Sequence, residues 1–205
     1  MLLSIDTSAG TSVAVVDLAG GTLSEVGEAD TRGHAEAIGT MIEQALAAAG
    51  VLPGDLSGVV AGMGPGPFTG LRVGIAAARA FAFGIGKPVL PMASHDAVAF
   101  GRTAPTLVVT DARRREVAWS VYAAPDADGF PVLVTGPHLN HPEDLDTAVE
   151  GCASLGRVDA AQISAASLGM LAERLYAAGR PFGPAEPLYL RAPDVTLSTP
   201  KRVTG

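Results

Sequence analysis

Residues 68–83 constrain the fold of this chain more than any other part of the sequence. Arg72 and Arg79 are seven residues apart, so they share one face of a helix, and almost every other residue there is glycine, alanine or a larger apolar residue. A helix that is apolar nearly all round must be covered on more than one side. A sheet can cover one side. The small residues Gly74 and Ala78 would let another helix approach closely on a second side, which we interpret as a subunit interface rather than a tight core.

The composition is that of a folded chain whose core holds small side chains. Of the 205 residues, 48% are hydrophobic, 17% are charged and 5% are aromatic, which excludes disorder as the main state. The net charge is −7 without a basic block, which disfavours stand-alone nucleic-acid binding. The single cysteine, Cys152, excludes an internal disulfide framework, and we interpret it as a buried small residue.

The sequence contains no recognisable targeting or membrane segment. Asp6 interrupts the opening apolar residues, and no basic region precedes them, so a signal peptide is not expected. The longest apolar region, 62–99, contains Arg72, Arg79, Lys87 and several prolines, and it predicts no membrane span. We therefore expect a cytoplasmic protein without a membrane partner.

Apolar runs and turn signals predict the element order β-β-β-α-β-α-β for residues 1–102. Apolar stretches bounded by glycine, proline and polar turns are typical of strands, whereas apolar residues at helical spacing that end at a glycine are typical of helices. The predicted strands are 2–5, 12–16, 22–30, 59–63 and 88–92, and the predicted helices are 34–49 and 68–83.

The second half of the chain, residues 103–205, starts a similar order afresh. The predicted strands are 106–110, 117–123 and 131–135, and the predicted helices are 141–149 and 164–178, with at best a weak strand between them. The tail, 179–205, is rich in proline and is expected to wrap over the body. The recurrence of β-β-β-α predicts an α/β protein of two lobes, 1–102 and 103–205, of which the second is smaller.

Two loops have residues that could contact a phosphate. The turn Asp6-Thr7-Ser8 follows an apolar strand, and such a turn can offer backbone N–H groups to a phosphate while the carboxylate organises a metal. The same residue types are ordinary turn formers, and spacing alone favours that role. The glycine-rich loop 62–67 precedes a predicted helix, yet it matches neither a P-loop nor a dinucleotide fingerprint.

Histidines and arginines form no recognisable catalytic or metal-binding motif. The four histidines lack the helical spacing of a metal pair, and we interpret them as surface or capping residues. Arg113, Arg114 and Arg115 stand together between two predicted strands. Such a cluster could contact a phosphate, but a solvated hairpin turn is the favoured interpretation.

Five segments together resemble the bacterial TsaB (YeaZ) family, in the same order along nearly the whole chain. The glycine-rich segment that opens the helix at 68 is the most specific of them. The segments are Ile5-Asp6-Thr7-Ser8, His34-Ala35-Glu36, Gly64-Pro65-Gly66-Pro67-Phe68-Thr69-Gly70-Leu71-Arg72, Asp111-Ala112-Arg113 and Pro187-Leu188-Tyr189-Leu190-Arg191. The resemblance implies an actin-like, Hsp70-like (ASKHA) fold of two related lobes, each with a mixed sheet flanked by helices and the second reduced.

The resemblance also implies a part in making threonylcarbamoyladenosine beside the anticodon of tRNAs that read codons beginning with adenine. In that family TsaD, the catalytic paralogue, transfers the threonylcarbamoyl group, TsaE is an ATPase, and TsaB is a non-catalytic partner that supports TsaD. TsaB is expected to meet tRNA only indirectly. No cofactor is required, although ATP or ADP can lie at the partner interface, and the phosphate contacts on this chain would be Asp6, Thr7 and Ser8.

The family's interface is a helix bundle formed by the first two helices, which correspond here to 34–49 and 68–83. The same family forms homodimers through an overlapping surface when TsaD is absent. The expected interface residues are His34, Ile38, Met41, Ile42, Ala45, Phe68, Leu71, Arg72, Gly74, Ile75, Ala78 and Arg79.

A departure from the catalytic paralogue implies that this chain has no catalytic or metal-binding residue. The paralogue carries two metal-binding histidines, four residues apart, just after the strand that matches 89–92. The aligned positions hold Ser94 and Val98, and a register shifted to use His95 puts Ala99 at the second position. Valine and alanine have no donor atom for a metal. Pro67, where the family commonly has serine, and the short second lobe argue against a complete nucleotide cleft.

Two enzymatic alternatives remain open on the sequence. A small actin-like ATPase, sugar kinase or other nucleotide-binding protein would use Asp6 and the glycine-rich loop, although the second lobe has no recognisable phosphate signature. A metalloprotease, suggested by older labels in the family, would need the missing histidine pair. ATP turnover by the isolated chain would favour the first alternative, and metal analysis would decide the second.

Overall fold

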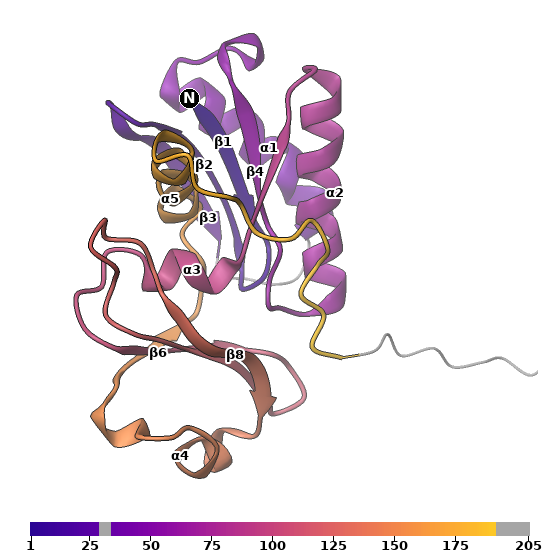
Figure 1. Ribbon diagram of the computed structural model, residues 1–205. Helices are drawn as coiled ribbons and strands as arrows, with labels where there is room; N and C mark the ends of the chain where they lie inside the picture. Colours follow the sequence, from indigo (N-terminus) through magenta and orange to yellow (C-terminus); the bar gives the residue numbers. More distant parts are fainter. Residues whose placement is uncertain (29–33, 192–205) are drawn as a thin grey trace, which may run out of the picture.

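The computed structural model describes residues 1–28 and 34–191, without the side chain of His34. The chain forms two mixed β-sheets, and the short helix α3 (Ser94–Ala99) lies between them (Figure 1). The strands are β1 (Leu2–Asp6), β2 (Thr11–Asp17), β3 (Gly21–Glu28), β4 (Gly58–Gly62), β5 (Val89–Met92), β6 (Thr106–Asp111), β7 (Val117–Tyr122), β8 (Leu133–Asn140) and β9 (Gly156–Ala160). The longer helices are α1 (His34–Ala49), α2 (Phe68–Gly84) and α5 (Ala165–Ala177), and α4 (Leu145–Ala148) is a single turn.

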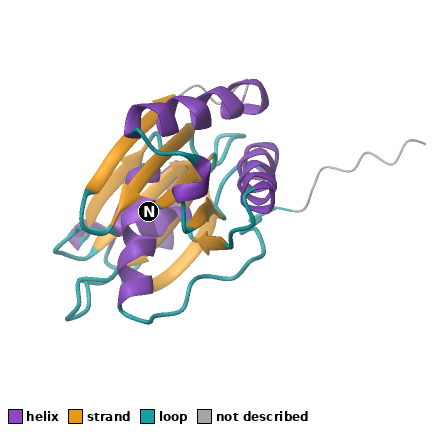
Figure 2. Ribbon diagram, turned by 90° about the horizontal axis from the view of Figure 1, so that it is seen from above, coloured by secondary structure: helices purple, strands orange, loops and turns teal. Residues whose placement is uncertain are grey.

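The first sheet has the strand order β3-β2-β1-β4-β5 and lies between two layers of helices (Figure 2). The strand β1 pairs antiparallel with β2 and parallel with β4. Side chains alternate along a strand, so Leu3 and Ile5 pack in one core with α1 and α2, whereas Leu2 packs in another with α5. Each large aliphatic side chain buried in this way contributes about 1.5–3 kcal/mol, which holds both helix layers on the sheet.

The helix α5 belongs in space to the first sheet, although it lies late in the sequence. Leu168 and Leu171 pack with Val16 and Val60 on the face opposite α1 and α2. The strands of the two sheets lie on either side of the predicted boundary at residue 102, whereas α5, from the predicted second lobe 103–205, packs on the first sheet. The physical reason is that the first sheet is apolar on both faces, and α1 and α2 cover only one of them.

The second sheet has the order β8-β7-β6-β9 and a smaller core. The strand β9 runs parallel to β6, so the weak strand expected between the last helices is a regular element. On one face Trp119 and Val121 pack with Leu145 and Val149. The strand β8 begins and ends later than the predicted 131–135, and Cys152 is half-buried rather than buried.

The expected α/β architecture is confirmed: two mixed sheets are flanked by helices, and the second is smaller. Each strand and helix predicted in residues 1–102 is present, whereas α3 is not among the predicted elements. In the described ranges, no helix combines the length and apolarity needed to cross a membrane.

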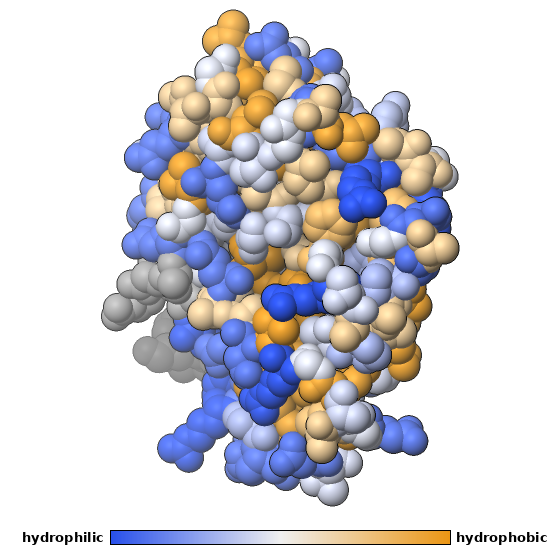
Figure 3. Space-filling view, turned by 90° about the vertical axis from the view of Figure 1, so that its left-hand side faces the viewer, coloured by the Kyte–Doolittle hydropathy of each residue, from blue (hydrophilic) through white to orange (hydrophobic). Residues whose placement is uncertain are grey.

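The side of the molecule away from α2 shows polar and apolar side chains intermixed (Figure 3).

Candidate functional site

The turn between β1 and β2 is buried, and its carboxylate is bonded to its own neighbours. Oδ1 of Asp6 accepts hydrogen bonds from the backbone N–H and the hydroxyl of Ser8, at 2.8 and 2.5 Å. Oδ2 accepts a hydrogen bond from the hydroxyl of Ser94 at 2.5 Å. Burial raises the pKa of Asp6, while the bonds from Ser8 and Ser94 act in the opposite direction. Both carboxylate oxygens are thus engaged within the chain.

Thr7 links the same turn to α2 through two hydrogen bonds. Its Oγ1 donates a hydrogen bond to the carbonyl of Gly70 at 2.7 Å and accepts one from the backbone N–H of Gly74 at 3.1 Å. The loop before α2 also lies on the turn, because a Cβ atom on Gly66 would stand only 2.6 Å from the carbonyl oxygen of Ser8. Glycine alone permits so close an approach of two backbones.

The expectation that Asp6, Thr7 and Ser8 face a phosphate does not agree with this geometry. Their exposed fractions are 1%, 2% and 1%, and the loop 64–67 would have to move before a ligand could reach them. The physical reason is the close packing of that loop and of α2 on the turn. The residues act here as an ordinary turn that fastens β1 to α2 and α3, which is the role that spacing alone favoured.

The helix α3 joins the two lobes through buried side chains. Nδ1 of His95 lies 2.8 Å from the hydroxyl of Ser120 on β7, and Nε2 lies 2.9 Å from the hydroxyl of Thr110 on β6. Burial lowers the pKa of His95 to about 3, so its imidazole is neutral at physiological pH. The expected surface or capping role is therefore wrong for His95. Beside it, the hydroxyl of Tyr122 donates to Asp96 at 2.7 Å.

The positions aligned with the paralogue's histidines do not suit a metal ion. Ser94 is fully buried, and its hydroxyl donates to Asp6 and accepts from the backbone N–H of Gly64 at 3.0 Å. Val98 has no donor atom, and both ring nitrogens of His95 already contact hydroxyls. Across residues 1–28 and 34–191, no three His, Cys, Asp or Glu side chains gather into a possible metal site. The residues at this place do not fit the metal of the catalytic branch.

Most of the expected interface residues are covered by the chain itself. They fill the core between the first sheet and the helices α1 and α2, and their exposed fractions are at most 8%. The eight buried residues are Ile38, Met41, Ile42, Ala45, Leu71, Gly74, Ile75 and Ala78. The expectation that these side chains form an outer surface is wrong, because the large side chains of both helices pack against one apolar face of the first sheet. Phe68 is half-buried, and the side chain of His34 lies outside the described residues.

The outer face of α2 consists of small residues, two arginines and one aromatic ring. Ala76 and Ala80 are exposed between Arg72 and Arg79, and Phe83 near the end of the helix is 89% exposed. The sequence analysis missed Ala76, Ala80 and Phe83. The two arginines could have indicated this face, because arginine is rarely buried without a partner. Ala76 lies four residues after Arg72, and Ala80 lies four residues after Ala76, which is the spacing of neighbours on one helix face.

Residues 180–191, which we call the strap, cross from the end of α5 to the second sheet along α2 (Figure 1). The backbone N–H of Leu188 donates to the carbonyl of Met63 at 2.8 Å. Arg79 donates to the carbonyl of Ala185 at 2.8 Å, and Arg72 donates to the hydroxyl of Tyr189 at 3.3 Å. The predicted wrapping tail is confirmed for the strap, whereas 192–205 lie outside the described residues.

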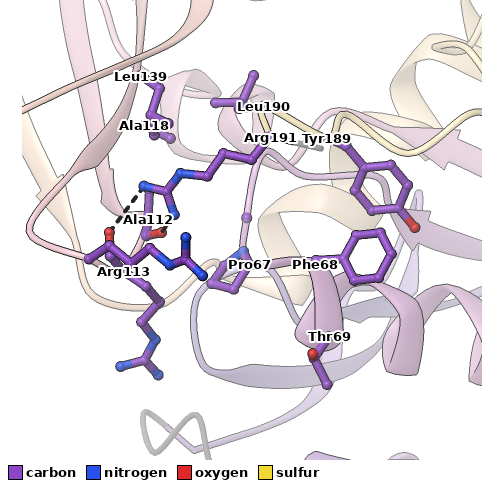
Figure 4. Close-up of a pocket in the computed structure, with 12 residues that line it drawn as sticks. Pro67, Phe68, Thr69, Ala112, Arg113, Ala118, Leu139, Tyr189, Leu190 and Arg191 are labelled. Carbon is purple, nitrogen blue, oxygen red and sulfur yellow. Dashed lines mark hydrogen bonds between the residues drawn. The ribbon is translucent and has the colours of Figure 1, made fainter. Parts of the chain in front are cut away.

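A cavity of about 410 Å³ lies where the strap, the start of α2 and the β6–β7 turn meet (Figure 4). That turn consists of Arg113, Arg114 and Arg115, which are exposed as expected for a solvated hairpin. The cavity is lined by the first two of them. The complete lining is Gly66, Pro67, Phe68, Thr69, Ala112, Arg113, Arg114, Ala118, Leu139, Tyr189, Leu190 and Arg191. Tyr189 and Arg191 belong to the last of the five family motifs, which by itself indicates no role for them.

Comparisons with known sequences identify the relatives of this chain. Residues 19–128, more than half of the chain, match the family model described as "TsaD: tRNA N6-adenosine threonylcarbamoyltransferase". An uncharacterised protein of Mycobacterium tuberculosis is 42% identical over 172 residues, which cover 80% of this chain and 78% of that protein. The tRNA threonylcarbamoyladenosine biosynthesis protein TsaB of Haemophilus influenzae is 34% identical over 124 residues, or 58% of this chain and 52% of that protein.

Solved structures show the same architecture. YeaZ from Pseudomonas aeruginosa superposes with a TM-score of 0.74 at 25% identity, covering 92% of this chain and 99% of that chain. A second structure from that organism, with similarity to the peptidase YeaZ, gives the same TM-score at 26% identity. These structures and the two mixed sheets confirm the two-lobed, actin-like fold. The chain belongs to the tRNA N6-adenosine threonylcarbamoyltransferase (TsaD) family and, within it, to the TsaB (YeaZ) branch.

Proposed function

We propose that this chain is a non-catalytic partner of a TsaD-type subunit in the transfer of threonylcarbamoyl to tRNA. The modified base is the adenosine beside the anticodon of tRNAs that read codons beginning with adenine. The family match and the TsaB relative support the pathway, and we place the protein in the cytoplasm with its tRNA substrate.

The hydrogen bonds around α3 are the observation that carries the non-catalytic part of this proposal. At the position where the catalytic branch holds its metal, Ser94 is bonded to Asp6 and His95 is bonded to both β6 and β7. These side chains are buried, so they hold the two lobes together instead of presenting donors to a metal or a substrate. A chain built in this way stabilises a partner's active site by contact.

The outer faces of α1 and α2 are the surface that we assign to the TsaD-type subunit. On α2 this face presents Ala76, Ala80 and Phe83, and small residues permit close helix packing. An exposed aromatic ring beside small residues is typical of a protein interface. The same face would join two copies of this chain when the TsaD-type subunit is absent, so homodimer and heterodimer compete for it.

The proposal includes a TsaE-type ATPase as a third component, with any ATP or ADP held between subunits. The buried turn Asp6–Ser8 disfavours a nucleotide inside the chain. For the same reason, an actin-like ATPase acting alone is the weaker alternative, and it requires ATP turnover by the isolated chain.

Reconstitution of tRNA modification tests the proposed function. We expect TsaD-type and TsaE-type proteins, ATP and the threonylcarbamoyl donor system to form at least tenfold more threonylcarbamoyladenosine when this chain is added. The chain alone should form none. Full modification without the chain, or modification by the chain alone, would contradict the proposal. Nucleosides released from digested tRNA are quantified by mass spectrometry.

A further inference from the structure

The cavity beside the β6–β7 turn has two unlike walls. Arg113 and Arg114 line one side, while Phe68 and Tyr189 line the other with their ring centres 4.8 Å apart. Figure 4 shows the side chain of Arg113 extending toward Pro67 and the two aromatic rings lying next to each other. Its volume of about 410 Å³ is near the small end of the range for ligand sites, roughly 300–1,000 Å³. A cation next to an aromatic platform suits an anionic group attached to a flat ring.

The backbone of the turn that contains the arginines is strained, and the strap stabilises it from outside. Arg113, Arg114 and Arg115 have φ angles of +66°, +57° and +63°, a left-handed conformation that costs about 1–2 kcal/mol for each residue with a side chain. Arg191 of the strap donates to the carbonyls of Ala112 and Arg113 at 3.2 and 3.3 Å and pairs with Glu116. Backbone strain that is held by its surroundings clusters at functional sites.

The turn is also a positively charged area on a negatively charged chain. Among the described residues, Asp111 lies 3.8 Å from Arg113, and Glu116 pairs with Arg191. Four arginines (Arg113, Arg114, Arg115 and Arg191) gather at this turn, although the whole chain has a net charge of −7. Arg115 is exposed and is not part of the cavity lining, so positive charge continues beyond the cavity.

We propose that this cavity binds one nucleotide of a single-stranded RNA segment. The base stacks on Tyr189, the adjoining phosphate contacts Arg113 and Arg114, and the next phosphate of the strand contacts Arg115. Phe68, whose ring centre lies 3.9 Å from the guanidinium of Arg72, supports Tyr189 from behind. Positive charge that continues from the cavity along the turn to Arg115 suits a continuing strand better than a free nucleotide. This inference deepens the proposed function, in which tRNA meets the chain only through its partner, by adding a direct contact.

Fluorescence anisotropy with the full chain and a labelled tRNA transcript tests the phosphate contacts. The affinity should fall as salt is raised, and the double variant Arg113→Gln/Arg114→Gln should lower the slope of log K against log salt by about 1.4, since each lost contact to a single strand removes about 0.7. The control Arg102→Gln/Arg157→Gln removes the same charge from exposed arginines outside the cavity and should keep the wild-type slope. Equal slopes for both double variants, or no binding by the wild type, would overturn the proposal.

Stacking is tested with Tyr189→Leu, which keeps an apolar side chain but removes the aromatic face. Loss of one stacked base should weaken RNA binding at least fivefold, which corresponds to about 1 kcal/mol, whereas Tyr176→Leu at another exposed tyrosine should not change it. ATP serves as a competitor. If ATP binds with the same arginine dependence and RNA does not bind, the RNA assignment is wrong. Complex formation between the wild-type chain and the TsaD-type subunit is measured separately. A failure of RNA binding can then be told apart from a failure of the proposed function.

Discussion

Gly74 determines how closely α2 approaches the turn after β1. Its backbone N–H donates to Thr7, and a Cβ atom at this position would collide with the Thr7 hydroxyl. We expect Gly74→Ala to lower the free energy of unfolding by about 1–3 kcal/mol through overpacking. The control Gly39→Ala lies in α1 with no atom near the added methyl group, so it should gain about 0.5–1 kcal/mol from helix propensity. Urea unfolding measures both, and equal effects would disprove a tight contact at Gly74.

His95 should make the protein less stable in acid. Its pKa in the folded chain is about 3, well below the ordinary 6.5, so between these values the unfolded chain binds a proton that the folded chain does not. Unfolding is therefore favoured as the pH falls below 6.5, by about 1.4 kcal/mol per pH unit from this residue.

The variant His95→Gln isolates that effect. Burial raises the pKa of Asp6 and Asp96, which opposes the trend by favouring the folded state in acid, but both carboxyls remain in the variant. Urea unfolding between pH 7 and 4.5 should therefore show a steeper loss of stability for the wild type than for His95→Gln. Parallel pH profiles would show that His95 is not a neutral, buried link between the lobes.

Single residues show where sequence reasoning succeeded. The turn-forming role of Asp6-Thr7-Ser8 follows from residue type alone and agrees with the hydrogen bonds. The burial of His95 could not be predicted, because its two hydroxyl partners come from β6 and β7 and nothing local to α3 indicates them. The same holds for Tyr189 and Arg191, which become part of a cavity only because the strap returns to α2 and the β6–β7 turn.

At the scale of elements, α2 shows that an apolar helix has one buried face and one available face. Ala78 is fully buried, whereas Ala80 is exposed two residues later. Ala78→Glu should lower the free energy of unfolding by about 3–5 kcal/mol, because it leaves an unpaired charge in the core. Ala80→Glu should change it by no more than about 0.5 kcal/mol yet weaken contact with a partner subunit. If Ala80→Glu unfolds the chain, the assigned outer face is wrong.

Element predictions were most accurate where periodicity was strong. The helices at 34–49 and 68–83 match α1 and α2 closely, and the meander of the first three strands is present. The predicted strand 131–135 differs from β8 (Leu133–Asn140) because residues 136–140 include glycine and proline. These residue types are typical of a turn. The placement of α5 on the first sheet could not be predicted, because which sheet a late helix covers depends on long-range packing.

At the scale of the whole molecule, hydrogen bonds from α3 and from the strap link the two lobes. The buried bonds of α3 connect both sheets, and the strap links α5, α2 and the β6–β7 turn. The family resemblance of five short motifs is confirmed by the family model that matches residues 19–128 and by the solved YeaZ structures.

Mixing this chain with the TsaD-type protein of its own organism tests the central claim most directly. Size-exclusion chromatography with light scattering should give a complex of the two chains in equal numbers. Ala80→Glu should elute as a folded chain, with unchanged circular dichroism, and should bind the partner at least tenfold more weakly. Two separate peaks for the wild-type mixture, with and without ATP, would contradict the account.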